Sequence, residues 1–386
     1  MTPLQAPTQD DPYGYYAQLR QQDTLFFDPV LGLWIASGAE AVEAILEHPE
    51  CRVRPLDQPI PPAIAQGAAG AVFCRLMRMN EGGLHQCPRR VFESALTAIE
   101  MPSIATAVSR VASTLDNPCV NPDELMFTLP ACVIAHLLGL PCSSLHRVAK
   151  LTRDFAACLS PLSDQAQLDK AHQAASQLGQ MFMAVLSDPD CDSPLLARIC
   201  SQSKAARWDD KEALIANLIG LLSQTCEATA GLIGNTLIAL HRNPDLIGDR
   251  PLASNLAAEL IAEVARHDSP VQNTRRFVAS RCTILGRVLE AGDTLLVILA
   301  SANRDPCANP DPDRFLLGRS DRRLFSFGSG RHECPGQQLA LTIAAEAIGV
   351  WLHHQPLNAA QAYSWRYVPS LNGRIPKFHT AKEAHL

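Results

Sequence analysis

The chain has 386 residues, of which 47% are hydrophobic and 19% charged, and its formal net charge is −6. This charge gives no general electrostatic case for nucleic-acid binding, and the 13 cysteines, odd in number and without CxxC pairs, argue against a disulfide framework or a zinc module. No linker, charge block or repeat divides the chain, so one domain over residues 1–386 is expected. Its polar start predicts no signal peptide or membrane anchor, and hence a cytoplasmic location.

The N-terminal half is predicted to be helical apart from one hairpin and one irregular segment. Residues 24–37 predict a hairpin that turns at Asp28-Pro29. Residues 53–70 are rich in Pro, Gly and Ala and cannot form one long regular element, which is typical of a functional loop. The expected helices cover residues 11–22, 39–48, 89–114, 122–139, 143–159 and 165–187.

The C-terminal half contains the longest helical segment. Residues 211–242 are apolar nearly all round, which predicts a buried helix. A second helix over residues 253–267 ends before Pro270, because a residue ahead of proline disfavours the helical conformation. The remaining expected elements are strands at 275–286 and 293–299, a helix at 337–352, and strand and turn at 363–380. The chain is therefore predicted to be mainly α with small β-sheets.

One cysteine, Cys334, follows a glycine-rich turn and precedes the predicted helix at 337–352. A helix N-terminus has unpaired N–H groups and a positive dipole end, and both stabilise an anion, so a thiolate is expected here. Gly328, Gly330 and Gly336 permit close approach of a flat metal complex. The alternative is a buried, inert thiol, the usual state of a free cysteine.

The run from Phe327 to Gly336, Phe-Gly-Ser-Gly-Arg-His-Glu-Cys-Pro-Gly, resembles the haem-binding loop of the cytochrome P450 family. The positions that carry the resemblance are Phe327, Gly328, Gly330, His332, Cys334 and Gly336. The resemblance implies that Cys334 is the axial thiolate of haem b, iron protoporphyrin IX, and that this sulfur favours O–O cleavage. It also implies the family's fold, a single triangular-prism-like domain with haem between the long central helix and the cysteine loop.

Haem carries two propionates that need cationic or hydrogen-bonding partners when buried. His85 and Arg89 are four residues apart, and this spacing resembles the family's propionate-binding helix. His332 lies in the cysteine loop itself. Arg276 is preferred over Arg275 as a further ligand, since strand alternation sends the two side chains to opposite faces. The alternative for His85 is an exposed helix histidine.

Glu263 and Arg266 resemble the family's Glu-x-x-Arg pair. Taken alone, a carboxylate and a guanidinium three residues apart would form a surface ion pair of little value. The resemblance implies instead that they lock the core that supports the thiolate loop. Arg304 or Arg314 is expected to be the third member of this group.

The middle of the long helix reads Ser-Gln-Thr-Cys-Glu-Ala-Thr from residue 223 to 229. The family's usual pattern there ends in an acid followed by two threonines. The acid is Glu227, but Ala228 stands where the first threonine is expected, and Thr229 points about 100° away. The candidate catalytic residues are therefore Glu227, Gln224, Thr225 and Thr229, with ordered water or a substrate hydroxyl as further proton donors. The alternative for both threonines is a hydrogen bond to the carbonyl four residues back.

The resemblance implies a soluble, monomeric, bacterial-type monooxygenase that inserts one atom of O2 into a small organic molecule, such as an intermediate of secondary metabolism. Electrons would come from a separate ferredoxin or flavodoxin, which could dock on a basic cluster of Arg89, Arg90, Arg322, Arg323 and Arg331. Because of Ala228, peroxide-driven oxidation, oxidative coupling or rearrangement is the alternative, and a haem protein without turnover is a third. Residues 60–72 predict a small apolar pocket wall, whereas Gln224 and Asn273 would suit a hydroxylated or amide-bearing substrate.

Overall fold

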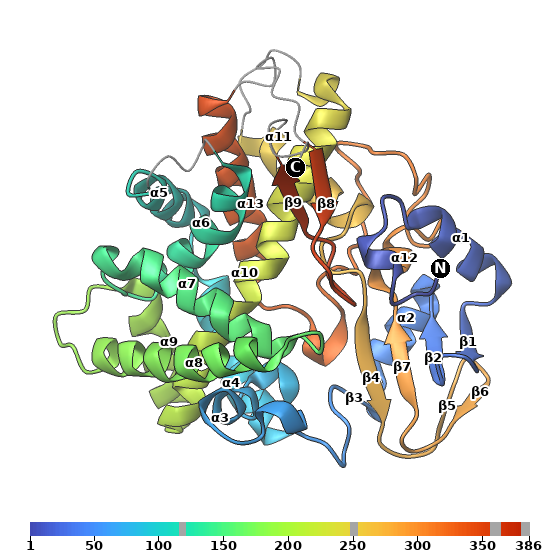
Figure 1. The fold of residues 1–386 in the computed structure, drawn as a ribbon, viewed down its shortest axis with the longest axis horizontal. Coiled ribbons are helices and arrows are strands. Elements are labelled where there is room, and N and C mark those ends of the chain that lie inside the picture. The colour runs from blue at the N-terminus through green and yellow to red at the C-terminus, as the bar shows by residue number, and fades with distance from the viewer. Residues whose placement is uncertain (116–120, 248–253, 356–363, 380–386) are drawn as a thin grey trace. The chain divides into compact units, whose positions relative to one another are not determined.

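The computed structural model describes residues 1–115, 121–247, 254–355 and 364–379 (Figure 1). It is mainly helical with small sheets, as predicted. The chain forms two compact units: unit 1 contains residues 1–57, 231–334 and 352–386, and unit 2 contains residues 58–230 and 335–351. The boundary falls inside two helices, α10 (Lys211–Arg242) and α13 (Gln337–His354), and each unit is described by itself.

Unit 1 contains a five-stranded sheet in the order β1-β2-β7-β4-β3. Strands β1 and β2 form the predicted hairpin, β2 runs parallel to β7, and β4 is antiparallel to β7 and to the short edge strand β3. Figure 1 shows β2, β7 and β4 side by side. The strands span Leu25–Asp28 (β1), Leu33–Ala36 (β2), Cys51–Arg52 (β3), Thr274–Val278 (β4) and Thr294–Val297 (β7).

Alternating residues of this sheet enter two different hydrophobic clusters, because successive side chains of a strand point to opposite faces. Leu295 and Val297 of β7 belong to the cluster that contains helix α2 (Ala39–Glu47). Leu296 belongs to the cluster that contains helix α1 (Tyr13–Gln22). The sheet therefore has apolar packing on both faces. The other elements of unit 1 are α11 (Ser254–His267), α12 (Leu299–Asn303) and the hairpins β5 (Cys282–Ile284) with β6 (Arg287–Leu289) and β8 (Ser364–Tyr367) with β9 (Pro376–His379).

Unit 2 is helical. Helix α7 packs against both α6 and α8, and α3 also packs against α8 (Figure 1). Most residues of α10 in this unit, including Leu218, Ile219 and Leu222, are buried, which confirms the prediction from their apolar pattern. The helices are α3 (Ala68–Phe73), α4 (Gly83–Thr97), α5 (Met101–Ala112), α6 (Pro122–Leu137), α7 (Leu145–Ala156), α8 (Gln165–Leu186) and α9 (Pro194–Ala205), with the unit's parts of α10 and α13.

Several helices of the structure differ from those predicted from the sequence. The single helix expected at 89–114 is two helices, because Pro102 occupies the first turn of α5, where proline favours the start of a new helix. Helix α4 begins six residues earlier than expected, at Gly83. Helices α9 and α12 were not predicted, and α3 begins inside the segment expected to be irregular. Residues 253, 363 and 380, which bound expected elements, lie outside the described residues.

Candidate functional site

The loop that carries Cys334 is closed by its own backbone. The Cys334 N–H donates to the Phe327 carbonyl over 2.8 Å, and the Gly328 N–H donates to the Phe325 carbonyl over 2.8 Å. Gly328 and Gly330 have φ values of +74° and +66°, in the left-handed region that glycine adopts without strain. The Cys334 side chain is half-buried. The sequence therefore folds this segment into a tight turn that presents one cysteine.

This loop is also fixed to the N-terminal part of unit 1. The Arg331 guanidinium donates to the Cys51 carbonyl over 2.8 Å and to the His48 carbonyl over 3.1 Å. A β-carbon added at Gly330 would lie 3.0 Å from Cγ of Glu47. The turn therefore packs closely on the end of helix α2, and its conformation is held from outside as well as from within.

The residues of the loop fit a haem. Haem iron takes four nitrogen ligands from the porphyrin and needs only one axial donor from the protein, and a single thiolate is one of its recognised ligands. No group of three or more His, Cys, Asp or Glu side chains among the described residues could hold a bare metal ion. One cysteine on a glycine-rich turn is thus suited to a metal that a flat macrocycle already holds.

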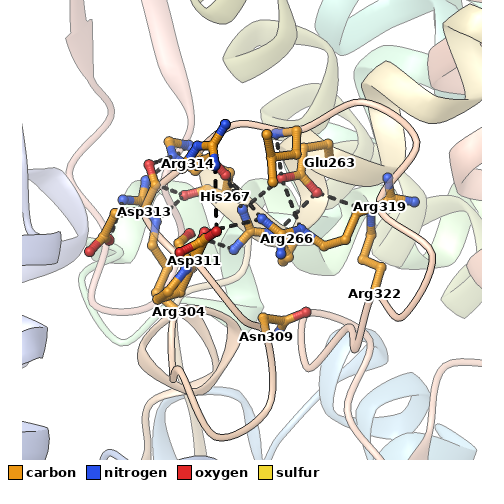
Figure 2. Close-up of polar contacts among 12 residues, drawn as sticks. Glu263, Arg266, His267, Arg304, Asn309, Asp311, Asp313, Arg314, Arg319 and Arg322 are labelled. Carbon is orange, nitrogen blue, oxygen red and sulfur yellow. Dashed lines mark hydrogen bonds and ion pairs between the residues drawn. The ribbon is translucent and has the colours of Figure 1, made fainter.

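Glu263 and Arg266, which precede this loop in the sequence, form a fully buried ion pair on helix α11 (Figure 2). Arg266 donates from Nε to Oε2 of Glu263 over 3.0 Å and from a terminal nitrogen to Oε1 over 2.7 Å. Its other N–H groups donate to the carbonyls of Asn303, Pro312 and Arg314. The pair is therefore the predicted structural lock and not a surface ion pair.

The third member of the lock is Arg322, and the prediction of Arg304 or Arg314 is wrong. Nε of Arg322 donates to Oε2 of Glu263 over 3.0 Å, and Nε of Arg319 lies 3.5 Å from Oε1. Burial raises the pKa of Glu263, but the hydrogen bonds from Arg266, the Leu316 N–H and Arg322 lower it below its ordinary value. Figure 2 shows Arg266, Arg319 and Arg322 around the Glu263 carboxylate.

Arg304 and Arg314, which were predicted as the third member, have other partners. Arg304 donates to the carbonyl and Nδ1 of His267 and pairs with Asp313, and Arg314 forms an exposed pair with Asp311. Arg314 reaches the lock only through its backbone carbonyl. The position of Arg322 also ties the lock to the chain that leads into the cysteine loop, four residues before Ser326, whose hydroxyl donates to the Ala265 carbonyl.

The predicted propionate ligands divide between the units. In unit 1, Arg276 of β4 is buried and Arg275 is exposed, which confirms the predicted alternation. Arg276 donates to the Arg275 carbonyl over 2.8 Å and to Oγ1 of Thr274 over 3.3 Å. His332 is half-buried in the short helical turn before Cys334.

In unit 2, His85 and Arg89 lie on helix α4. His85 is 4% exposed and its Nδ1 is 3.0 Å from the Met77 carbonyl, so the alternative of an exposed histidine is wrong. Arg89 makes a bidentate pair with Glu93, with distances of 3.0 and 2.9 Å. Gly336 also belongs to unit 2, at the start of α13. The convergence of all these residues on one haem stays a prediction of the motifs.

Three of the four candidate catalytic residues of α10 are accessible to solvent. Glu227 is exposed, and Gln224 and Thr225 are half-exposed, as is Ala228. The Thr225 hydroxyl donates to the Leu221 carbonyl over 2.7 Å, which confirms the structural alternative for this residue. Thr229 is 1% exposed, and its hydroxyl has no hydrogen-bond partner in the part of the chain that the structure describes, so the same alternative is wrong for Thr229.

Glu227 carries the carboxyl group among these four candidates, and the pKa of this carboxyl is raised. Although its side chain is accessible, protein surrounds it closely enough that burial raises its pKa, and the positive charge of Arg78 opposes this shift. A carboxyl in this setting carries its proton to a higher pH than an ordinary glutamate does. This accessible carboxyl is therefore the group of α10 whose proton affinity the protein raises.

Comparison with known proteins settles the family. The cytochrome P450 family model matches residues 255–354. Vitamin D(3) 25-hydroxylase of Pseudonocardia autotrophica is 31% identical over 279 residues, which cover 69% of this chain and 66% of that protein. The putative cytochrome P450 133B2 of Xylella fastidiosa is 27% identical over 394 residues, covering 94% of each chain. The chain belongs to the cytochrome P450 family.

A solved structure supports the fold of this P450 over nearly its whole length. The crystal structure of P450BioI in complex with an acyl carrier protein ligated to hexadec-9Z-enoic acid has a TM-score of 0.81 and 24% identity, and covers 95% of this chain and 97% of that one. P450 proteins bind haem b, and this P450 is a monooxygenase of the oxidoreductase class. Within the described residues, no helix is both long and apolar enough to cross a bilayer.

The structure also shows which residues the sequence analysis of this P450 missed or misjudged. Arg78, whose charge acts on Glu227, was not singled out, although a cation between Met77 and Met79 is a visible signal in an apolar stretch. Asn273 is 2% exposed and its amide donates to the Leu371 carbonyl over 2.8 Å, so it serves the fold there. Arg322 is occupied by the lock and does not contribute to an open basic surface.

Proposed function

We propose that this P450 is a haem-thiolate monooxygenase in which Cys334 is the axial ligand and which inserts one atom of O2 into a small organic substrate. The observation that carries the proposal is the Cys334 loop: a half-buried cysteine on a turn that contains two left-handed glycines. The chain leading into this turn is tied to the buried Glu263–Arg266 lock through Arg322 and Ser326. Such a support keeps the sulfur in one place.

The bound haem would supply O2 activation, with the thiolate donating electron density to the iron. His85, Arg89, Arg276 and His332 would hold its propionates, since their side chains are cationic or bear N–H groups. Phe327, Gly328 and Gly336 would shape the contact with the macrocycle, because glycine leaves room where a β-carbon would not.

Glu227 would hold the proton that the reaction consumes. Its raised pKa keeps the carboxyl protonated nearer to neutrality, and it is accessible on α10. Gln224 and Thr225 lie within one turn of it, although the Gln224 amide donates to the Gly220 carbonyl over 2.9 Å and the Thr225 hydroxyl is bonded to its own helix. Thr229 has the least support, because its hydroxyl is closed off from solvent. The transfer would then use ordered water or a hydroxyl of the substrate.

The lack of an accessible, unengaged hydroxyl among residues 224–229 favours a second candidate function. Without such a group, this P450 would use peroxide, couple substrates oxidatively or rearrange them. Product formed only with O2 and a reducing protein supports the monooxygenase, whereas product formed equally well with hydrogen peroxide alone supports the second candidate. A haem protein that forms no product under either condition would be a binding protein.

Electrons would come from a separate ferredoxin or flavodoxin. Of the predicted basic cluster, Arg90 and Arg323 are exposed, and Arg323 pairs with Glu43 at the surface. Exposed cations of this kind can steer an acidic partner, with a dependence on ionic strength. We further propose that the chain forms one P450 domain, because helix α10 runs unbroken through the boundary between the units. We also propose a cytoplasmic monomer, as the resemblance implies.

The carbon monoxide complex of the reduced protein tests the ligand assignment. We expect the red-shifted Soret band of thiolate ligation in the wild-type protein, and its loss in Cys334→Ala. Cys307→Ala, which removes an exposed thiol elsewhere, is the matched control and should keep the band. If freshly loaded wild-type protein lacks the band, or if Cys334→Ala retains it, the proposal is wrong.

A further inference from the structure

The segment predicted to form an apolar pocket wall, residues 60–72, is anchored on its C-terminal side to helix α10. The Met77 N–H donates to Oδ1 of Asn217 over 2.8 Å, and the Asn217 amide donates to the Arg75 carbonyl over 3.0 Å. The Arg75 guanidinium also pairs with Glu212 of the same helix. The chain that leaves the segment is therefore fixed by hydrogen bonds and an ion pair that do not involve the segment itself.

The other end of this segment depends on one side chain of a neighbouring helix. Helix α3 begins after Gly67, which has no side chain to cap it. The Ala69 N–H, in the first turn, donates instead to Nδ1 of His172 on α8 over 3.2 Å. The imidazole also lies against Gly67, where a β-carbon would be 2.8 Å from Nδ1 and 3.0 Å from Cε1. His172 thus provides from α8 the acceptor that an N-cap residue usually provides within its own helix.

Little apolar burial supports the segment between these two attachments. Most of residues 58–67 are exposed, and the buried large side chains are those of Ile64 and Phe73. A β-carbon at Gly70 would lie 2.0 Å from the Ile64 carbonyl oxygen, so the short turn Pro62–Ile64 and helix α3 form one compact piece. A piece with few buried contacts opens locally at low free-energy cost. Its attachment through His172 therefore matters.

The hydrogen bond from Ala69 requires a neutral imidazole. Nδ1 accepts through its lone pair, whereas a protonated ring carries an N–H on both nitrogens and accepts nothing. Protonation of His172 would therefore place one N–H against another and leave the Ala69 amide without its acceptor. Histidine is the side chain whose charge changes between about pH 5 and 8. The contact that holds α3 at high pH is thus the one that acid removes.

The elements around the imidazole offer it no other hydrogen bond. Helix α3 has no charged residue, and the short turn after α7 contributes Cys158, whose pKa burial raises to about 12. Asp169 and Lys170 of α8 itself are exposed. Helix α7, which packs on α8, has its charged or titratable side chains exposed or half-buried at His146, Arg147, Lys150, Arg153 and Asp154. In the described parts of the chain, the bond from α3 is the hydrogen bond that the His172 ring makes.

We propose that His172 is a pH-sensitive latch: the neutral imidazole holds the N-terminal end of α3 on α8, and the protonated imidazole releases it. The released piece, residues 62–73, would remain attached through the anchored chain at residues 75–77. Because the proton binds only the released form, a fall in pH shifts the equilibrium toward release. Resting on the function proposed above, the latch would loosen one wall of the substrate pocket in acid.

Hydrogen exchange of the haem-loaded protein at pH 8.0 and pH 5.5 tests the proposal, with rates corrected for the intrinsic effect of pH on amide exchange. We expect protection of residues 68–73 to fall about tenfold, the effect of one ordinary imidazole that is protonated only in the released form. Residues 174–185 of α8 serve as the reference within the same molecule and should keep their protection.

His172→Gln should remove the pH dependence, because its amide does not titrate; this holds whether or not its oxygen reaches the Ala69 N–H. His146→Gln, which replaces an exposed histidine of α7, is the matched control and should keep the tenfold fall.

Two results would overturn the proposal. One is equal corrected protection of residues 68–73 in the wild-type protein at both pH values, a result that needs no variant. The other is a His172→Gln protein that shows the same fall as wild type. Neither measurement involves turnover or substrate, so the exchange result stands apart from the carbon monoxide band that tests the ligand assignment.

Discussion

Arg266 shows how one residue decides the architecture around the cysteine loop. Its guanidinium is fully buried and all three nitrogens donate: Nε and Nη2 to Glu263, and Nη1 and Nη2 to backbone carbonyls. A buried charge is tolerated only when it is paired and hydrogen-bonded in this complete way. The Glu-x-x-Arg spacing predicted the pair from the sequence. Arg322, however, is 59 residues from Glu263, and only the path of the intervening loop brings it there.

Arg322→Gln should therefore destabilise the protein more than Arg314→Gln does. Arg322 contributes a hydrogen bond from Nε to the buried Glu263 and a second to Glu259, so its loss should cost about 1–3 kcal/mol. Arg314 makes an exposed pair and supports the lock through its carbonyl, which glutamine keeps, so its loss should cost less than about 1 kcal/mol. Urea unfolding of the two variants measures the difference. Equal costs would mean that Arg322 is not the third member of the lock.

At the scale of elements, strong periodicity predicted most helices and the hairpin of β1 and β2. Helix α10 has the bounds that its apolar pattern predicted. Helix α9 was missed although Ser193 and Pro194 form a good N-terminal signal, with the Ser193 hydroxyl accepting from the Leu196 N–H. Helix α12 has five residues, too few to show a period.

Within the candidate site, predictions that depended on local pattern succeeded and those that depended on distant contacts did not. Strand alternation predicted that Arg276, and not Arg275, is the buried residue. The electrostatic effect of Arg78 on the pKa of Glu227 links positions 149 residues apart, and no periodicity of the sequence predicts it. The same holds for Arg322. Long-range polar contacts follow from tertiary packing, which a single sequence does not reveal.

Helix α3 depends on one glycine at its start. Gly67 has a φ of +106°, and a β-carbon there would lie 2.8 Å from Nδ1 of His172 on α8. That nitrogen accepts a hydrogen bond from the Ala69 N–H over 3.2 Å, so the glycine and the histidine together fix α3 against α8. Replacement of Gly67 would strain the backbone and disturb this contact.

We expect Gly67→Ala to lower the free energy of unfolding by about 1–3 kcal/mol and to increase amide exchange in residues 68–73. Gly179→Ala is the matched control: it lies inside helix α8, a β-carbon there meets nothing within 4 Å, and alanine should leave stability unchanged or raise it by up to about 1 kcal/mol. Urea unfolding and hydrogen exchange check both variants. A Gly67→Ala protein as stable as wild type would show that α3 does not need this turn.

At the scale of the whole molecule, several buried groups make stability depend on pH. The lowered pKa values of Asp268 and Glu263 mean that their contributions are present above about pH 4.5 and are lost as the pH falls through the lower folded values. The raised pKa of Glu227 acts in the opposite sense, because the folded form then binds more protons just above that range. Between about pH 4.5 and 6.5, the slope of unfolding free energy against pH depends mainly on His136 and His267, whose pKa values burial lowers.

His267 should dominate that slope. Burial, followed by the charge of Arg304, lowers its pKa from 6.5 to about 4. The neutral ring is suited to its contacts, since Nε2 lies 3.0 Å from the Asp313 carbonyl and Nδ1 accepts from Arg304 over 2.9 Å. The unfolded chain binds a proton below about pH 6.5 and the folded chain only near pH 4, so stability falls as the pH drops through this window. The loss should reach at most about 3 kcal/mol.

His267→Gln should flatten the dependence of unfolding free energy on pH between 4 and 6.5, whatever its effect on stability at pH 7. Glutamine can still donate to the Asp313 carbonyl, and the backbone carbonyl of residue 267 still accepts from Arg304. His136, whose pKa burial also lowers, and Glu227 are unchanged in this variant, so the difference from wild type isolates His267. Urea unfolding at half-unit pH intervals measures it, with the exposed His353→Gln as control. Parallel curves for His267→Gln and wild type would show that the buried imidazole is not the group that makes this fold sensitive to acid.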